Sequence, residues 1–202
     1  MTTPEEKAEA RSRRIGFIWN LFLGFLISAL SVLTATTNYM AYRAGNVASD
    51  YDAEGERSLA LSNTDYIRAN QFVILDYTMY DGERINRDVD DFAADYYLAN
   101  FSAELQASVD RGSAFDDQYY TEMYAESDKA FSEAFGYFDQ ANAEEDREAG
   151  YQLAMLIAAV GLAFAAYASM LDNVKFLRGV FSVLALIILV IGSGQFLLAF
   201  LF

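Results

Sequence analysis

The sequence predicts an all-α integral membrane protein with three transmembrane helices and a helical, hairpin-like acidic ectodomain. The stretches 15–35, 151–171 and 179–202 contain no charged side chain, and at about 1.5 Å per residue each is long enough to cross a bilayer. Residues 36–150 hold 25 of the 29 acidic residues against 8 basic ones, a net charge of −17. The one proline is Pro4, so no later residue is forced out of a helix by proline.

Basic residues beside the predicted spans indicate how the chain crosses the membrane. Arg11, Arg13 and Arg14 lie in a tail of residues 1–14, and Lys175 and Arg178 lie in a connector of residues 172–178. The positive-inside bias places both segments in the cytoplasm, with the acidic block and the C-terminus outside. The apolar run 15–35 exceeds the ~7–15 residues of a signal-peptide core, so we expect an uncleaved anchor.

The composition removes several classes of chemistry. The chain has no cysteine and no histidine, which excludes disulfides, thiolate ligands and the commonest physiological general base. An outer domain held by packing alone fits the inner (cytoplasmic) membrane of a bacterium or archaeon. A block of charge −17 repels nucleic acid. The sequence has no glycine-rich phosphate loop and no nucleophile elbow, so we expect no enzymatic activity and no small-molecule substrate.

Within the acidic block, apolar and aromatic residues recur every three or four positions, which indicates helices. Ser62-Asn63-Thr64-Asp65 is typical of a helix start, Asp81-Gly82 and Arg111-Gly112-Ser113 are typical of turns, and Gly45 and Gly55 are possible breaks. We expect tyrosine and phenylalanine to fill a helical core, since 12 of the 14 tyrosines lie here; the alternative is that exposed tyrosines anchor a partner. The stripes are Tyr66, Val73, Tyr77, Tyr80; Ile85, Val89, Phe92, Tyr96, Ala99, Ala103; and Tyr120, Tyr124, Phe131, Phe135, Phe138, Ala141.

The last ectodomain helix is expected to continue without a break into the second span, over residues 116–171. Tyr39, Tyr42 and Tyr151 flank the apolar stretches, and we expect them at the level of the lipid headgroups.

Small residues form stripes on all three spans, and such stripes mark faces where helices approach closely in lipid. Either these faces pack the three helices of one protomer, or one of them, most plausibly that of the third helix, meets a neighbouring subunit. We expect Asn20 to hydrogen-bond another helix. The stripes are Gly16, Asn20, Gly24, Ser28; Gly161, Ala165, Ser169; and Ala185, Gly192, Ala199.

Two acidic clusters are candidate cation sites. Asp50, Asp52 and Glu54 precede Gly55 with the spacing of an EF-hand opening, although the twelfth position is Leu61 instead of glutamate. Asp88, Asp90 and Asp91 form the second cluster. The sequence thus leaves Ca²⁺ as a candidate ligand, against the simpler interpretations of an ordinary acidic turn for the first cluster and a solvated charged face for the second.

The layout is similar to that of a family of small uncharacterised prokaryotic membrane proteins. They have one N-terminal membrane helix, a helical hydrophilic segment and two closely spaced C-terminal membrane helices. The segments that carry the likeness are 34–44 and 151–202 with its short basic connector. The resemblance implies an architecture and no activity.

These observations predict a non-enzymatic protein whose function is association. It would act as an accessory or scaffolding subunit of a larger membrane assembly, or as a homo-oligomer. Its partners would be membrane lipid and other membrane-protein subunits or a second copy. The alternative is a cation-responsive sensor that binds Ca²⁺ or Mg²⁺ through its carboxylate clusters.

Overall fold

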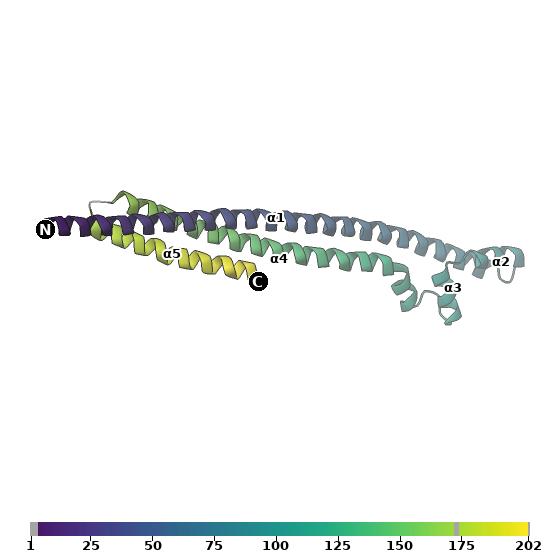
Figure 1. Cartoon of the computed structure of the whole chain (residues 1–202). Helices are drawn as coiled ribbons and strands as arrows, with labels where there is room; N and C mark the ends of the chain where they lie inside the picture. The colour runs from purple at the N-terminus through teal and green to yellow at the C-terminus, as the bar shows by residue number, and fades with distance from the viewer. Residues whose placement is uncertain (1–3, 172–173, 202) are drawn as a thin grey trace. The chain divides into compact units, whose positions relative to one another are not determined.

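The computed structural model describes residues 4–171 and 174–201, and these residues are all-α, as predicted (Figure 1). The helices are α1 (Pro4–Asn86), α2 (Asp91–Ala99), α3 (Ala103–Asp110), α4 (Asp117–Met170) and α5 (Lys175–Leu201). Residues 1–3 of the predicted tail, Asp172 and Asn173 of the connector, and Phe202 lie outside the described residues, as do the side chains of Arg11 and Arg13.

Three helices, α1, α4 and α5, are long and apolar enough to cross a membrane. The chain divides into two compact units, and α1 and α4 each pass from one unit into the other. Unit 1 comprises residues up to Ser49 and those from Ala141 onward, and unit 2 comprises Asp50–Gln140. Unit 1 therefore contains the three apolar segments together with residues 36–49 and 141–150 of the predicted acidic block.

The core of unit 1 is formed where large side chains of α1 meet small residues of α4 and α5. Leu26 and Leu30 are fully buried against Ala158, Ala165 and Ala185. Because α4 and α5 present methyl groups there, the helices approach closely and the leucines fill the space between them.

A second cluster in unit 1 joins Ala41 and Ala44 of α1 to Tyr151 of α4 and Ala199 of α5. The predicted headgroup-level tyrosines differ in their surroundings. Tyr39 and Tyr42 are exposed, whereas Tyr151 is buried and its ring lies 5.7 Å from that of Phe196. Tyr151 is thus part of the core.

In unit 2, α1 and α4 run antiparallel, the arrangement expected of a helical hairpin. In the contacting pairs Tyr51–Tyr137, Ser62–Ser127 and Tyr77–Tyr120, the residue numbers increase along α1 while those of the partners on α4 decrease. The pair Ser62–Ser127 is buried: Ser127 Oγ donates to the Ser62 carbonyl at 3.1 Å, and the two hydroxyl oxygens are 3.3 Å apart.

Small residues every seven positions form the seam between the two helices. A seven-residue repeat keeps one face of a helix toward its partner, as in coiled coils. Along α4, alanines and Ser127 recur in the same way. In this register α1 buries Ala41, Ala48, Gly55, Ser62 and Ala69, followed by the acidic residues Asp76 and Glu83, and the buried positions on α4 in unit 2 include Ser127, Ala130 and Ala134.

The prediction that tyrosine and phenylalanine fill the core is therefore wrong for most of unit 2. Tyr119 is the fully buried large aromatic side chain there, whereas Tyr66, Phe131 and Phe135 are about half exposed. These rings pair along the flanks of the seam; the centroids of Tyr66 and Tyr124 are 5.3 Å apart. The seam is built mainly from alanine, glycine and serine, and most of the rings lie beside it.

The predicted breaks within α1 are also wrong, because the helix is continuous through Gly45, Gly55, the Ser62–Asp65 segment and Asp81-Gly82. The glycines allow close contact. A Cβ atom would lie 2.6 Å from Glu148 Oε2 at position 45, from the Phe138 ring at position 55 and from the Tyr97 ring at position 82. At each of these positions a neighbouring side chain lies against the backbone, so a residue larger than glycine would clash.

The chain turns at 87–90, 100–102 and 111–116 instead, so the stripe predicted from Ile85 to Ala103 is not one helix. Asp90 caps α2 by accepting from Ala93 N, and Ser102 caps α3 by accepting from Leu105 N, the usual role of short polar side chains at helix starts. The predicted turn at Arg111-Gly112-Ser113 is confirmed, with Gly112 at a φ of 94°. The predicted continuity over 116–171 is confirmed by α4.

Candidate functional site

A network of polar contacts joins α1, α3 and α4 in unit 2. At its centre is Asp76, which is 1 % exposed. Its carboxylate accepts from Ser102 N at 3.0 Å, from Ser102 Oγ at 2.5 Å and from the Tyr119 hydroxyl at 2.8 Å. Three donors compensate the burial of this group, which is costly without hydrogen bonds. Asp76 therefore fastens the start of α3 and the first turn of α4 to α1.

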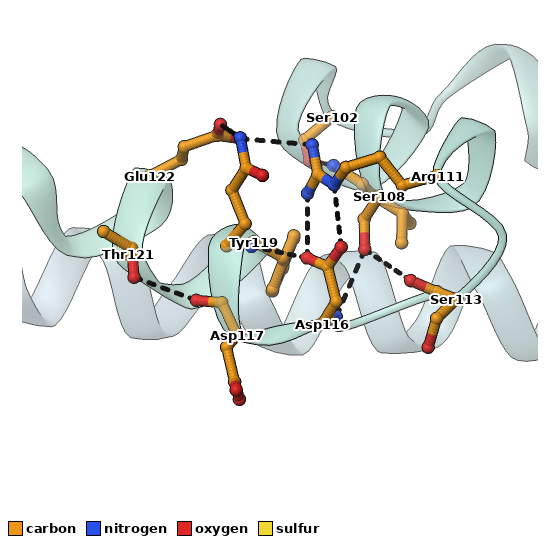
Figure 2. A network of polar contacts seen from close by, with 11 residues as sticks. Ser102, Ser108, Arg111, Ser113, Asp116, Asp117, Tyr119, Thr121 and Glu122 are labelled. Carbon is orange, nitrogen blue, oxygen red and sulfur yellow. Dashed lines mark hydrogen bonds and ion pairs between the residues drawn. The ribbon is translucent and has the colours of Figure 1, made fainter.

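A second set of contacts, drawn in Figure 2, closes the loop between α3 and α4. Arg111 donates through Nε and Nη2 to the two carboxylate oxygens of Asp116 at 2.7 and 2.8 Å. Asp116 Oδ1 also accepts from Tyr119 N at 2.7 Å and so caps α4. Ser108 Oγ donates to the Ser113 carbonyl at 2.7 Å and accepts from Asp116 N at 3.2 Å.

The electrostatics of this loop follow from these contacts. The hydrogen bond from Arg111 holds the pKa of Asp116 well below its ordinary value, and the bond from Tyr119 N acts in the same direction. Burial raises the pKa of the Tyr119 phenol far above its ordinary value, and the hydrogen bond to Asp76 raises it further. A hydrogen bond with Tyr77, 2.7 Å between the hydroxyl oxygens, raises the pKa of Tyr120 to about 12.

Phe115 adopts a left-handed backbone with a φ of 60°, which is uncommon for a residue other than glycine. Its ring stacks on Tyr77 with centroids 4.0 Å apart and meets Tyr80 and Tyr119 edge-on at 5.5 and 5.1 Å. These aromatic contacts offset the cost of the backbone conformation, which is of the order of 1–3 kcal/mol. The Phe115 ring thus packs the loop against α1 and α4.

Chemically, the network is saturated by its own donors and acceptors. Asp76 and the Tyr119 hydroxyl are buried, and each atom that would act on a substrate is already engaged with another part of the fold. The geometry is that of a joint that fixes α2, α3 and the loop before α4 to the hairpin.

A cavity of about 300 Å³ lies beside this joint, between α1, α3 and α4. Its lining contains four carboxylates and one guanidinium, namely Asp65, Arg68, Glu104, Glu122 and Glu126. Arg111 Nη1 lies 3.9 Å from Glu122 Oε2. Among the described residues, no three carboxylates are arranged to hold a metal ion.

The residues predicted as cation ligands are not brought together. Asp50, Asp52 and Glu54 lie within α1, so the predicted EF-hand-like loop is wrong. Successive helical positions point 100° apart, which turns Asp52 away from its two neighbours. Glu54 instead forms an ion pair with Arg57 at 2.6 Å.

The second predicted cluster lies at the turn before α2. Asp90 Oδ1 accepts from Ala93 N at 3.2 Å, and Asp91 is the first residue of α2. Asp88, Asp90 and Asp91 are all exposed. Capping of the helix accounts for Asp90, and the other two carboxylates face solvent.

The predicted small-residue stripes fall into two groups. Those of α4 and α5 lie mainly inside unit 1. That of α1 lies mainly outside, because Leu23, Leu26 and Leu30 occupy its inner face. The buried residues are Gly161, Ala165, Ala185, Gly192 and Ala199; Gly16 is half-buried; and Asn20, Gly24, Ser28 and Ser169 are exposed.

Asn20 contacts another helix, as its polarity in an apolar segment suggests. Its Oδ1 accepts a hydrogen bond from Arg178 Nη2 of α5, and Arg178 is 7 % exposed. Sequence reasoning assigned Arg178 to a connector, whereas α5 begins at Lys175 and includes it.

Two apolar grooves follow the outer side of α1 in unit 1. One, of about 740 Å³, is lined by residues of α1 alone, among them Asn20, Gly24 and Ser28. The other, of about 570 Å³, lies between α1 and α5 and includes Ser28 and Ser193. A Cβ atom added at Gly24 would meet nothing within 4 Å.

An exposed apolar group at the turn between α1 and α2 was missed as a surface, because periodicity placed its members in a core. Ile85 is 71 % exposed, Val89 83 % and Phe92 86 %. The signal available in the sequence was Asp90, a short polar residue of the kind that caps helix starts, which lies within the predicted stripe. We call Ile85, Val89 and Phe92 the apolar tip.

Compared with known protein families, characterised proteins and solved structures, the chain shows no significant similarity. The architectural resemblance to small prokaryotic membrane proteins therefore stays a prediction.

Proposed function

We propose that this is a non-enzymatic integral membrane protein whose function is association with protein subunits. The apolar segments of α1, α4 and α5 cross the inner membrane of a bacterium or archaeon, with the N-terminus in the cytoplasm and unit 2 outside. Unit 2 presents a binding surface to a partner, and the protein acts as an accessory or scaffolding subunit. The single observation that carries this proposal is the apolar tip.

The apolar tip holds the three most exposed large apolar side chains of unit 2. Exposed apolar groups in contact with water are unfavourable by about 25 cal/mol per Å², and clusters of them mark interaction sites more often than isolated residues do. Ile85 lies in the last turn of α1, Val89 in the turn that follows it and Phe92 in the first turn of α2. The joint around Asp76 fixes the start of α3 and the first turn of α4 to α1 nearby.

Charge around the tip specifies the partner. Between residues 81 and 92 the chain carries five acidic and two basic side chains. Both basic side chains interact with other residues of unit 2. Arg87 forms an ion pair with Glu83 at 2.8 Å, and Arg84 lies over the Tyr80 ring at 5.8 Å. An apolar pocket bordered by lysine or arginine complements such a tip, because opposite potentials steer and orient association.

The outer face of α1 supports a second contact, within the membrane. Burial of apolar surface does not distinguish lipid from protein there, so a face of glycine and serine gains more from a close-packed helix than from lipid chains. Gly24 and Ser28 line the grooves on this face, and we propose that a helix of a second copy occupies them.

Site-specific photocrosslinking in native membranes tests the apolar tip. A photoreactive phenylalanine analogue at position 92 is expected to give a discrete protein adduct, and the same analogue at position 131 serves as the control, since Phe131 is 49 % exposed on α4. The purified partner should then bind the wild type and lose about ten-fold in affinity for Phe92→Ser, the equivalent of about 1.4 kcal/mol. Equal crosslinking at both positions, or unchanged binding by the variant, contradicts the proposal.

Substitution of Gly24 tests the contact within the membrane. A Cβ atom at Gly24 would meet nothing within 4 Å, and the position is exposed, so the monomer of Gly24→Leu is expected to fold normally. Its dimer in mild detergent should dissociate, as measured by light scattering. Val160→Leu, at an exposed position of α4, is the matched control. A wild type that is monomeric, or a Gly24→Leu variant as dimeric as the control, refutes this part.

A further inference from the structure

A cavity of about 250 Å³ lies in unit 1, and all three long helices contribute to its lining. Arg43 comes from α1, Glu144, Arg147 and Tyr151 come from α4, and Phe200 comes from α5. The lining thus combines guanidinium groups from α1 and α4 with the apolar side chain of Phe200.

The cavity lies where the apolar segments end. Residues 15–42 contain no charged side chain, and Arg43 is the first charged residue after them. Residues 149–171 are also uncharged, and Arg147 lies two positions before this stretch. The two guanidinium groups therefore flank the same end of the apolar segments, the level at which phosphate groups of lipids lie whichever way the chain crosses the membrane.

The charges facing the cavity favour an anion. Arg147 Nη1 bonds Glu144 Oε1 at 2.8 Å, whereas Arg43 is exposed and forms no ion pair with any described residue. Glu148 is turned toward the backbone of Gly45 and accepts from Gln152 at 2.7 Å. The lining thus holds two guanidinium groups and one carboxylate.

The guanidinium group of Arg43 is a planar fork of N–H donors that matches phosphate oxygens. Met40 and Phe200 extend the lining from this fork toward the apolar segments, and Phe200 is 55 % exposed. A ligand with a phosphate at one end and hydrocarbon at the other satisfies both parts of the cavity.

We propose that this cavity binds the phosphodiester group of a membrane glycerophospholipid. Arg43 donates to the phosphate oxygens, Arg147 contributes positive charge from the facing helix, and an acyl chain runs along Met40 and Phe200. The site fixes the level at which the three helices sit in the bilayer. This inference is independent of the protein partner proposed above.

Native mass spectrometry of the full-length protein in detergent tests the site. The probes are dioleoylphosphatidylglycerol and dioleoylglycerol, which has the same acyl chains and no phosphate. The wild type should retain the phospholipid and not the diacylglycerol. Arg43→Gln should weaken retention about ten-fold, about 1.4 kcal/mol, and Arg43→Lys should fall between the two because it keeps the charge without the fork.

Arg57→Gln is the matched control, since Arg57 lies on the same helix, is exposed and is outside the cavity. Retention by this variant should equal that of the wild type. Equal losses in Arg43→Gln and Arg57→Gln, or no loss in either, would overturn the proposal. So would equal retention of both lipids. If inorganic phosphate at the lipid's own concentration displaces the phospholipid, the cavity is a site for free phosphate and the lipid proposal is wrong.

Discussion

The buried hydroxyl of Tyr119 offers the sharpest test of the joint in unit 2. Tyr119→Phe removes one oxygen atom and leaves the ring in place. In the folded protein that oxygen donates to Asp76 Oδ2 at 2.8 Å, and the two residues are 0 % and 1 % exposed. Hydrogen bonds to carboxylates contribute about 1.5–3 kcal/mol. Because Ser102 still donates two hydrogen bonds to Asp76, we expect a loss of about 2 kcal/mol, within that range.

A loss of about 2 kcal/mol raises the equilibrium constant for local opening about 30-fold, since about 1.4 kcal/mol corresponds to ten-fold. Hydrogen exchange of the full chain in lipid nanodiscs, read by mass spectrometry, measures this constant segment by segment. The amides of α3 and of the first turns of α4 should exchange about 30-fold faster in the Tyr119→Phe variant, in line with the hydrogen-bond range used above.

Tyr137→Phe is the control for this experiment. Tyr137 lies on the same helix and stacks on Tyr51, and its hydroxyl forms no hydrogen bond with another described residue, so its removal should leave exchange unchanged. If exchange in α3 is the same for wild type, Tyr119→Phe and Tyr137→Phe, the hydroxyl does not hold the joint together and the reasoning is refuted.

Three further predictions concern pH and packing. Burial raises the pKa of Tyr119, so the folded protein holds this proton more tightly than the unfolded chain. The resulting stability is present below pH 10.0 and is lost as the pH rises above it. Melting curves at alkaline pH should therefore show a smaller loss of stability for Tyr119→Phe than for the wild type. The pKa of Asp116 is lowered by Arg111, so its stabilisation is present above pH 3.8 and is lost as the pH falls, and acid melting of Asp116→Asn should depend less on pH. Gly161→Leu should lower the Tm in detergent, because a Cβ there would lie 2.8 Å from a neighbouring side chain and overpacking costs about 1–3 kcal/mol; Val160→Leu, at an exposed position of the same helix, should melt like the wild type.

Helix packing explains which stripes of residues were interpreted correctly. Periodicity of aromatic residues located helices, but it did not identify the inner face, because tyrosine and alanine recur on the same α1 helix at similar spacings. The seam is built mainly from alanine, glycine and serine, and most rings lie beside it, although the Phe138 ring lies against Gly55. Ala185, Gly192 and Ala199, which are seven positions apart on α5, are buried; the same spacing on α1 identifies its seam.

Contacts distant in the sequence explain most of what was missed at the candidate sites. Asp76 and Tyr119 are 43 positions apart, and nothing local to either residue indicates the bond between them. Arg43 and Arg147 were counted as two charges in an acidic block, and only the packing of α1 against α4 brings them to one cavity. Of the predicted cation ligands, Asp50, Asp52 and Glu54 are separated for the converse reason, because a continuous helix turns neighbouring carboxylates in different directions. Asp88, Asp90 and Asp91 lie at an exposed turn, where Asp90 caps α2.

The sequence alone determined the all-α class, the three apolar segments, the continuity of α4 and the turn at Gly112. These depend on the local spacing of apolar and charged residues and on the conformational freedom of single residues, which neighbouring positions largely decide. The tertiary structure alone decided that α1 continues through its glycines, that small residues form the seam, and that Ile85, Val89 and Phe92 are exposed. The physical reason is that burial depends on the opposing surface, and the identity of that surface is set by residues many positions away.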